Sequence, residues 1–532
     1  MSFAEGFQAP GNTSWLRRFL IFGLVALVPL SRAPAKDTGN LSDLVFRFHV
    51  TQLPGSVSPL KQKGAGAMYL LGQLYFPLLQ WKGNRLHPLA GDCRKMASRK
   101  IRCQIQKSLT WTDGSPLLAE DYVQSFRDWV QPENRAFRSD LLLKLKNAES
   151  VLRGDKKSDS LGVWSRGQEL WLELEKTADP SEFLENLAHP LLTPFDRRLL
   201  NEALQIPLEQ LRWPGRYRID AWNLEQVQLR SREPNLPNLK IPIIFDEAVA
   251  LKKYQEGELD WLRRLPTSLI ESYKNSSELI RSPQHRMDAI YLSPKLPREV
   301  RKALAHSLRY ADLSKLLNSP SRPFQYPGCF GIPDTLWGKK TLCHNFSEKR
   351  DVRSMELWSR TSATEERIFV YSKAGGDDFR KIADWLQLQW NKNLGLQIQV
   401  QGLEDKIFQE RVQQKSLFAF RKGWVPESSS CLSAVRIFHS RHPENWARIH
   451  DKKLDAWIDL LGSSSKRKPN LHKICYQILN QLLEEAYIIP LGAIDFVSLL
   501  KPHWTGLEIT AWNQLSLGYI RRTSNLPPKI EK

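Results

Sequence analysis

The alternation of apolar and polar residues between positions 367 and 401 predicts a strand, a helix and a second strand. Arg367 to Tyr371 is a short apolar run of the kind found in buried strands. The next apolar residues recur every three or four positions, as on one face of a helix: Phe379, Ile382, Ala383, Leu386, Trp390 and Leu394. Gly395 stands where a left-handed residue commonly ends a helix. Leu396, Ile398 and Val400 then alternate with glutamines, which is the period of a strand with one polar face.

A second helix over Lys406 to Val412 and a third strand over Leu417 to Phe420 extend the pattern to a βαβαβ unit. Such units have parallel strands joined by right-handed crossovers. Ligands of open parallel sheets bind beyond the carboxyl ends of the strands. We therefore expect Arg421 to Glu427, directly after the third strand, to lie at a binding site.

Residues Leu109 to Trp129 predict a strand, a tight turn and an amphipathic helix. Asp113-Gly114 is a turn pair, and Ser115-Pro116 continues the break. Acidic residues follow in the first turn of the expected helix, where they favour the positive end of its dipole. The apolar residues of this helix recur at helical spacing: Tyr122, Phe126, Trp129 and Val130.

The first 35 residues predict an export signal. Arg17 and Arg18 precede a run of 12 apolar residues from Phe19 to Leu30, and Ala33-Pro34-Ala35 supplies small residues for signal peptidase. The run is short for a membrane span, and an uncleaved anchor is the alternative interpretation. No later segment approaches the length of a membrane span without charges, so we expect a soluble, periplasmic mature product.

The chain carries a strong positive charge that is spread along its length. Its 77 Lys and Arg and 57 Asp and Glu give a formal charge of +20, and loss of residues 1–35 would leave about +18. Such a field attracts acidic peptides, phospholipid headgroups or nucleic acid without choosing among them. No nucleic-acid-binding motif is present, so we expect no nucleic-acid partner. The 532 residues are enough for two or three domains.

Six cysteines in an exported chain predict disulfides. Cys93 and Cys103 flank a plausible hairpin connection, and Cys329 and Cys343 bracket a loop with Pro and Gly. We therefore pair each of these cysteines with its near neighbour. Spacing alone leaves other connectivities open.

A metal site is an alternative use of some of these residues. It would be built from Cys431, His439, His442 and His450, but their spacing matches no standard ligand pattern. We interpret the segment as a His-rich surface loop, and we expect no metal and no cofactor.

The segment around the predicted turn resembles a known family, the peptide-type extracellular solute-binding proteins of family 5. These proteins feed ABC importers and carry a W-x-D-G-x-P-x-x-A-x-D-[FY]-V signature. Weaker matches, such as Gly215 to Ile219, Tyr254 to Asp260 and Gly423-Trp424, follow in order over more than 400 residues. The signature residues that match are Trp111, Asp113, Gly114, Pro116, Ala119, Asp121, Tyr122 and Val123.

The resemblance implies an α/β fold, namely a two-lobed periplasmic binding protein of type II (cluster C) with an extra domain inserted in the first lobe. It also implies that the chain crosses twice between the lobes and that a peptide is held in the closed cleft. The implied domains are a signal peptide at 1–35, lobe I at 36–81, 197–286 and 493–532, inserted domain II at 82–196, and lobe II (domain III) at 287–492.

The resemblance also assigns ligand-binding residues. Arg421 stands where oligopeptide-binding members carry an arginine for the peptide carboxylate, and Glu427 stands where they carry an aspartate for the α-amino group. Both roles suit the chemistry of charge-assisted hydrogen bonds. Trp424 is expected in the core or the pocket wall, and Asp405 occupies a place where several members carry Trp. The alternative is that Arg421 and Glu427 pair with each other or with solvent.

Several positions depart from the family pattern and leave the ligand open. Val425 to Cys431 replaces an acidic run that usually contains Asp-Pro, and Phe76-Pro77 replaces a Glu-Gly pair. We expect a periplasmic binding component that delivers peptides to the permease subunits of an ABC importer, and not an enzyme. A divergent receptor for another ligand is the alternative.

An exported hydrolase is the second alternative. The chain has no GxSxG, HExxH or P-loop motif. Adjacent carboxylates such as Asp377-Asp378 point in different directions on a helix, so we interpret them as surface charge and not as a catalytic pair.

Overall fold

The computed structural model describes residues 44–523 except for 63–67, 84, 97–98, 177, 202–205, 323, 331–341, 344–357, 359–365, 415–416, 427–429 and 463–469. The predicted signal at 1–35 and the predicted ligand residue Glu427 therefore lie outside the described residues. None of the helices described within this range combines the length and the apolar character needed to cross a membrane.

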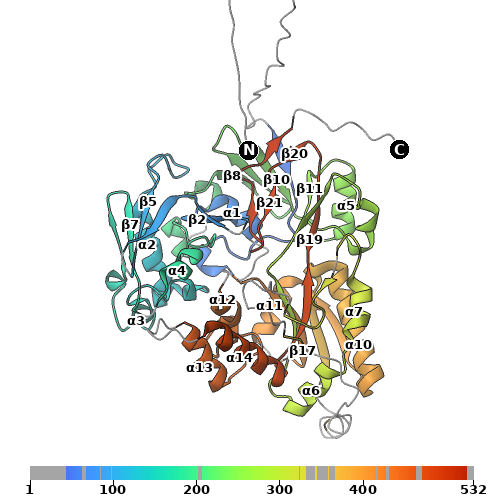
Figure 1. The fold of residues 1–532 in the computed structure, drawn as a ribbon. Coiled ribbons are helices and arrows are strands. Elements are labelled where there is room, and N and C mark those ends of the chain that lie inside the picture. The colour runs from blue at the N-terminus through green and yellow to red at the C-terminus, as the bar shows by residue number, and fades with distance from the viewer. Residues whose placement is uncertain are drawn as a thin grey trace, which may run out of the picture. The chain divides into compact units, whose positions relative to one another are not determined.

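The N-terminal half of the chain contributes two four-stranded sheets. One has the order β1 (Val45–Arg47), β10 (Asn238–Pro242), β9 (Gln226–Ser231) and β8 (Tyr217–Trp222). The other has the order β4 (Gly91–Lys95), β5 (Lys100–Ile105), β7 (Glu169–Glu173) and β6 (Val163–Arg166), and helix α2 (Ala119–Val130) packs beside it (Figure 1). A single large apolar core joins residues of both sheets, including the fully buried Tyr122, Phe126 and Trp129 of α2.

The C-terminal half of the chain is built on one six-stranded sheet. Its order is β14 (Phe324–Gln325), β18 (Ile488–Ile494), β13 (Met287–Leu292), β17 (Ala419–Trp424), β15 (Ile368–Ser372) and β16 (Gln399–Leu403). Strands β15, β16 and β17 are parallel, as predicted for the βαβαβ unit, whereas β13 runs antiparallel to β17.

Successive residues of β13 point into two different cores, as the two-residue period of a strand requires. Ile290 and Leu292 pack with α6 (Arg298–His306), α7 (Tyr310–Leu317) and α10 (Gly376–Leu394) on one face. Met287, Ala289 and Tyr291 pack on the other face, against α11 (Asp405–Gln414), α12 (Cys431–Val435), α13 (Lys452–Leu461) and α14 (Leu471–Glu484).

The chain passes twice between the N-terminal sheets and the six-stranded sheet. A three-stranded sheet of order β11 (Trp261–Leu262), β19 (Phe496–Leu500) and β12 (Leu279–Ser282) lies at the crossing. The first crossing leads from β12 to β13 through residues 283–286, and the second leads from β18 to β19 through Asp495. Two short connections of this kind are the places where a two-lobed protein can bend.

Most elements predicted from the apolar pattern are present, with shifted ends. Gly395 closes α10 in the left-handed conformation, with φ 66°, as predicted. The prediction of a strand at Leu109 is wrong. Thr110 forms a single isolated bridge, to Pro116, because the turn at Asp113-Gly114 reverses the chain directly after it. The third strand of the βαβαβ unit is longer than predicted, and Arg421 to Trp424 lie within β17 and not after it, because β13 pairs with them.

The cysteine prediction is confirmed for both predicted pairs. Cys93 and Cys103 face each other across β4 and β5 and form a disulfide, as do Cys329 and Cys343. The remaining two, Cys431 and Cys475, form a third.

The histidines near Cys431 lie on a loop, as predicted, and His450 is exposed, but the predicted surface position is wrong for His439 and His442. Both side chains are largely buried and lie close to carboxylates. His439 Nε2 is 3.3 Å from Oδ1 of Asp459, and His442 Nε2 is 3.6 Å from Oδ2 of Asp140. No group of three or more candidate ligands is close enough to hold a metal ion among the residues that the structure describes.

Candidate binding cavity

A cavity of about 370 Å³ lies beside the two crossing segments. Gln284, from the first crossing, and Asp495, from the second, both lie on its wall. One side of the wall comes from the six-stranded sheet, mainly from β17, and the other comes from α1 (Met68–Leu74), from the segment after β11 and from residues near Trp512. The cavity is therefore bounded by both halves of the chain.

Three of the four predicted ligand residues lie on this wall. Arg421 and Trp424 come from β17, and Asp405 is the first residue of α11. The fourth, Glu427, is outside the described residues. The βαβαβ prediction brought the first three together because α11 and β17 belong to the same unit.

Arg421 is paired with a buried carboxylate that the sequence did not point to. Its Nη2 atom lies 2.6 Å from Oδ2 of Asp288, and only 3% of the residue is exposed. Arg286 contacts the same carboxylate at 3.1 Å, and the guanidinium of Arg421 stacks on the ring of Phe379. Burial raises the pKa of Asp288, but Arg286 and Arg421 outweigh burial and hold the pKa below its usual value. Asp288 is thus ionised and bridges two guanidinium groups.

Gly423 makes room for this ion cluster. A Cβ atom at this position would lie 2.6 Å from Nη2 of Arg286 and even closer to Oδ1 of Asp288. A Cβ atom never approaches another heavy atom outside its own chain neighbours this closely, so any side chain here would displace Asp288 and Arg286. The glycine of the Gly-Trp motif is therefore required by a close approach and not by a turn.

Asp378 forms a second buried ion pair on the wall, which corrects its interpretation as surface charge. The residue is 9% exposed, and its Oδ2 atom lies 2.7 Å from Nη1 of Arg322, while Thr267 donates to Oδ1. Its neighbour Asp377 is exposed. Adjacent helical residues point about 100° apart, so one carboxylate of this pair faces solvent and the other faces the core.

A third charged cluster lies where the wall meets the loop after α12. Arg138 binds Asp140 at 2.9 Å, and Glu444 lies 3.9 Å from the same arginine. Arg436 also contacts Asp140, at 3.3 Å. Among the described residues, two arginines therefore face two carboxylates in this cluster.

Basic residues outnumber acidic ones among the described residues of the wall. The acidic side chains are Asp288, Asp378, Asp405, Glu444 and Asp495. The basic side chains are Arg138, Arg263, Arg264, Arg286, Arg322, Arg421 and Lys422. Most of these were missed from the sequence, although the Arg263-Arg264 pair directly after a buried strand is a visible signal.

Trp424 and Asp405 have defined partners. The indole of Trp424 donates to the carbonyl of Ala434 at 3.0 Å, and its ring packs edge-on against Phe438, so the residue is both core and wall. The carboxylate of Asp405 accepts a hydrogen bond of 2.6 Å from Ser372. Asp405 has no salt bridge to any described residue, which leaves its charge available to a ligand.

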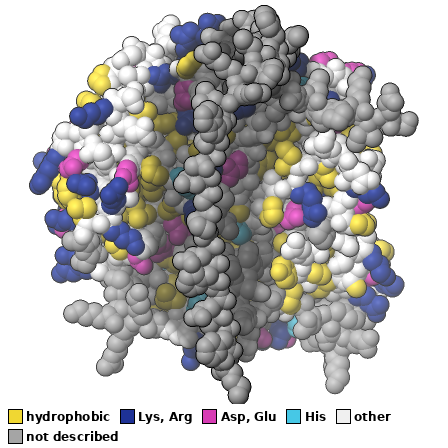
Figure 2. All heavy atoms as spheres, turned by 45° about the horizontal axis from the view of Figure 1, so that its top comes forward, with side chains coloured by type: hydrophobic (Ala, Val, Ile, Leu, Met, Phe, Trp, Pro, Cys, Tyr) yellow, Lys and Arg dark blue, Asp and Glu magenta, His cyan; other side chains and the backbone are white. Residues whose placement is uncertain are grey.

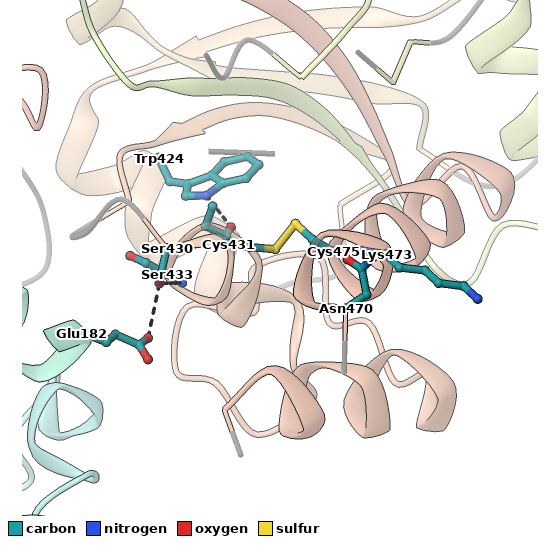
Figure 3. The surroundings of a disulfide bond; sticks show 9 residues. Glu182, Trp424, Ser430, Cys431, Ser433, Asn470, Lys473 and Cys475 are labelled. Atoms are coloured by element: carbon teal, nitrogen blue, oxygen red, sulfur yellow. Dashed lines mark hydrogen bonds between the residues drawn. A yellow bond between two sulfur atoms is a disulfide. The ribbon is translucent and has the colours of Figure 1, made fainter. Parts of the chain in front are cut away.

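Two links join the chain after β17 to other elements, a hydrogen bond from Ser430 and a disulfide from Cys431 (Figure 3). Ser430 accepts from the amide of Ser433 and so caps α12, and it also donates to Glu182 of α4 (Pro180–Asn186). The Cys431–Cys475 disulfide ties α12 to α14. These links hold the end of β17, and with it the wall of the cavity. A charged cavity where the chain crosses between two halves is the arrangement of a two-lobed binding protein.

Comparison with known proteins agrees with this class. The sequence profile of the bacterial extracellular solute-binding proteins, family 5 Middle, matches residues 97–443. The chain is 21% identical to the oligopeptide-binding protein OppA of Bacillus subtilis over 394 residues, which cover 66% of this chain and 69% of that protein. It is 22% identical over 531 residues to the probable deoxycholate-binding periplasmic protein YgiS of Escherichia coli, covering 94% and 96%.

A solved structure shows the same fold. The Escherichia coli murein tripeptide binding protein MppA superposes with a TM-score of 0.79 at 18% identity, over 91% of this chain and 99% of that one. The protein therefore belongs to the bacterial extracellular solute-binding proteins, family 5. The predicted fold class, a two-lobed α/β binding protein, is confirmed.

Proposed function

We propose that the protein is the binding component of an ABC importer and that it captures peptides in this cavity. The open edge of β17 carries the proposal. Strand β17 pairs with β13 along Ala419 to Trp424, but with β15 only at Ala419 and Phe420. Beyond Phe420, the edge that faces away from β13 has no strand partner in the described part of the chain. An extended peptide can complete such an edge with main-chain hydrogen bonds.

The side chains along this edge suit the ends of a peptide. Arg421 lies on the cavity wall, and its buried Nε atom has no hydrogen-bond partner among the described groups, so Asp288 does not use all the donors of this guanidinium. Asp405, and Glu427 outside the described residues, supply carboxylates for an α-amino group. Trp424 forms apolar wall. We propose these four residues as the ligand contacts.

Mass spectrometry of ligands that co-purify with the native protein, followed by calorimetry with a mixed tri- to pentapeptide library, tests the proposal. We expect peptides in the native material and heat of binding from the library. Deoxycholate is a useful comparison ligand, given the name of one relative. Binding of deoxycholate with no binding of any peptide would reject peptide capture and favour a receptor for another solute.

We also propose that residues 1–35 are a cleaved signal, that the mature protein works in the periplasm, and that the domains have the boundaries predicted from the sequence. The two chain crossings support the boundaries near 286 and 493, because each lies at a change of sheet. N-terminal sequencing of the exported protein should begin near Lys36. An intact Met1 in the membrane fraction would contradict cleavage.

A further inference from the structure

Two basic side chains on the cavity wall form no salt bridge with a described carboxylate. Lys422 is 8% exposed, its ammonium donates to the amide oxygen of Gln409, and it lies 4.1 Å from the centre of the Trp446 ring. Arg263 lies over the ring of Tyr69, and its Nε atom is buried without a hydrogen-bond partner. Neither residue forms a salt bridge with any other described residue. Removing such charges from water, fully for Lys422 and partly for Arg263, is costly unless something compensates them.

The neighbouring charges leave a further positive excess. Arg286 and Arg421 share the single carboxylate of Asp288, so one of their two charges is uncompensated. Other ion pairs at the wall are matched one to one: Arg322 with Asp378, Arg264 with Glu247, and Arg281 with Asp495.

Among the described residues of the wall, only one carboxylate lacks a basic partner. This is Asp405, which is bound by the hydroxyl of Ser372. Three uncompensated positive charges therefore face one free carboxylate among the described residues. On the face shown in Figure 2, Lys and Arg side chains lie at several separate places, so the basic residues visible there are not confined to one site.

Resting on the peptide-binding function proposed above, we infer that the ligand is an acidic peptide, selected by Lys422 and Arg263 through its carboxylate side chains. The two ends of an ordinary peptide carry opposite charges and cancel. Within the described part of the wall no further carboxylate balances this excess, and negative charge in the side chains of the ligand would compensate it. The ammonium of Lys422 is buried and the guanidinium of Arg263 is partly buried, so both are strong donors to such carboxylates with less competition from water.

Calorimetry with three matched tetrapeptides, Ala-Glu-Glu-Ala, Ala-Gln-Gln-Ala and Ala-Lys-Lys-Ala, tests the inference. Charge-assisted hydrogen bonds in a desolvated site predict that the Glu peptide binds about 10- to 100-fold more tightly than its Gln isostere, with the Lys peptide weakest. Equal affinity for all three would overturn the inference and leave peptide capture intact. If none of the three peptides binds, and no peptide of the mixed library binds, the proposed function itself would be rejected.

Variants of Lys422 and Arg263 test whether these two residues cause the preference for acidic peptides. Lys422→Met and Arg263→Met should each reduce the preference for Glu over Gln about 10-fold, while affinity for the Gln peptide changes less than about 3-fold. Lys501→Met is the matched control, since Lys501 also lies 4.1 Å from a ring centre, that of Tyr254, but not on the cavity wall. An unchanged preference in both cavity variants would overturn the assignment.

The dependence on pH gives a second readout. Burial lowers the pKa of Lys422 to about 8, with Glu444 and Asp405 opposing this shift and Arg286 adding to it. Lys422 is therefore charged at neutral pH and loses its proton above pH 8, although a bound carboxylate delays that loss. The preference for the Glu peptide should decline between about pH 7 and pH 9.5 in the wild type. In Lys422→Met that decline should be absent, and a decline of equal size would contradict the role of Lys422.

Discussion

Asp288→Asn is expected to lower the free energy of unfolding by about 3 to 5 kcal/mol, the cost of leaving a buried charge without its partner. Asp288 is the only carboxylate that contacts Arg421 within the described residues, and it also holds Arg286. An asparagine keeps the shape but removes the charge, so two guanidinium groups would repel each other inside the wall. Urea unfolding, followed by circular dichroism, measures the change.

The matched control is an exposed ion pair of the same chemistry. Arg94 and Asp92 lie 2.7 Å apart, with 70% and 46% of their side chains exposed. Asp92→Asn should cost about 0 to 1 kcal/mol, because water screens the pair. If both variants lost the same small amount of unfolding free energy, Asp288 would not be the buried bridge between Arg286 and Arg421 that the structure shows.

Arg421→Ala is expected to weaken peptide binding by about 2 to 5 kcal/mol, because the ligand carboxylate would remain buried without its partner. Asp288 keeps Arg286 as a counter-charge, so the variant should still fold. Calorimetry with a peptide from the native material measures the loss, and circular dichroism checks the fold.

Arg94→Ala removes an exposed arginine and is the control for this variant. It should leave affinity unchanged, since Arg94 is not on the cavity wall. Unchanged affinity in a folded Arg421→Ala protein would mean that Arg421 serves only its bridge to Asp288, and that the peptide carboxylate is bound elsewhere.

The predicted βαβαβ unit shows what local pattern can establish. The stripe from Phe379 to Leu394 and the terminating Gly395 depend only on residues close in sequence, and both appear in α10. The period of the apolar residues also identified the strands on either side of each helix. A strand-helix-strand order predicts parallel strands, and β15, β16 and β17 are parallel. The placement of Arg421, Trp424 and Asp405 on one wall followed from this unit and from the family resemblance.

The ion network of the cavity was beyond such reasoning, because its partners are distant in sequence. Arg322 and Asp378 are 56 positions apart, and no sequence motif links the two residues. Asp378 was misjudged because an acidic pair at a helix start is usually solvated, whereas here the packing turns one carboxylate inward. The length of β17 was likewise set by its antiparallel partner β13, which no local pattern in β17 reveals.

The central claim is that a peptide lies in the cavity as an added strand along β17, and a crystal structure of the protein with its native ligand tests it most directly. The account predicts peptide main chain hydrogen-bonded to the edge of Arg421 to Val425, with ligand carboxylates near Lys422 and Arg263. A ligand bound away from that edge, or a cavity that holds a molecule with no peptide main chain, would contradict it.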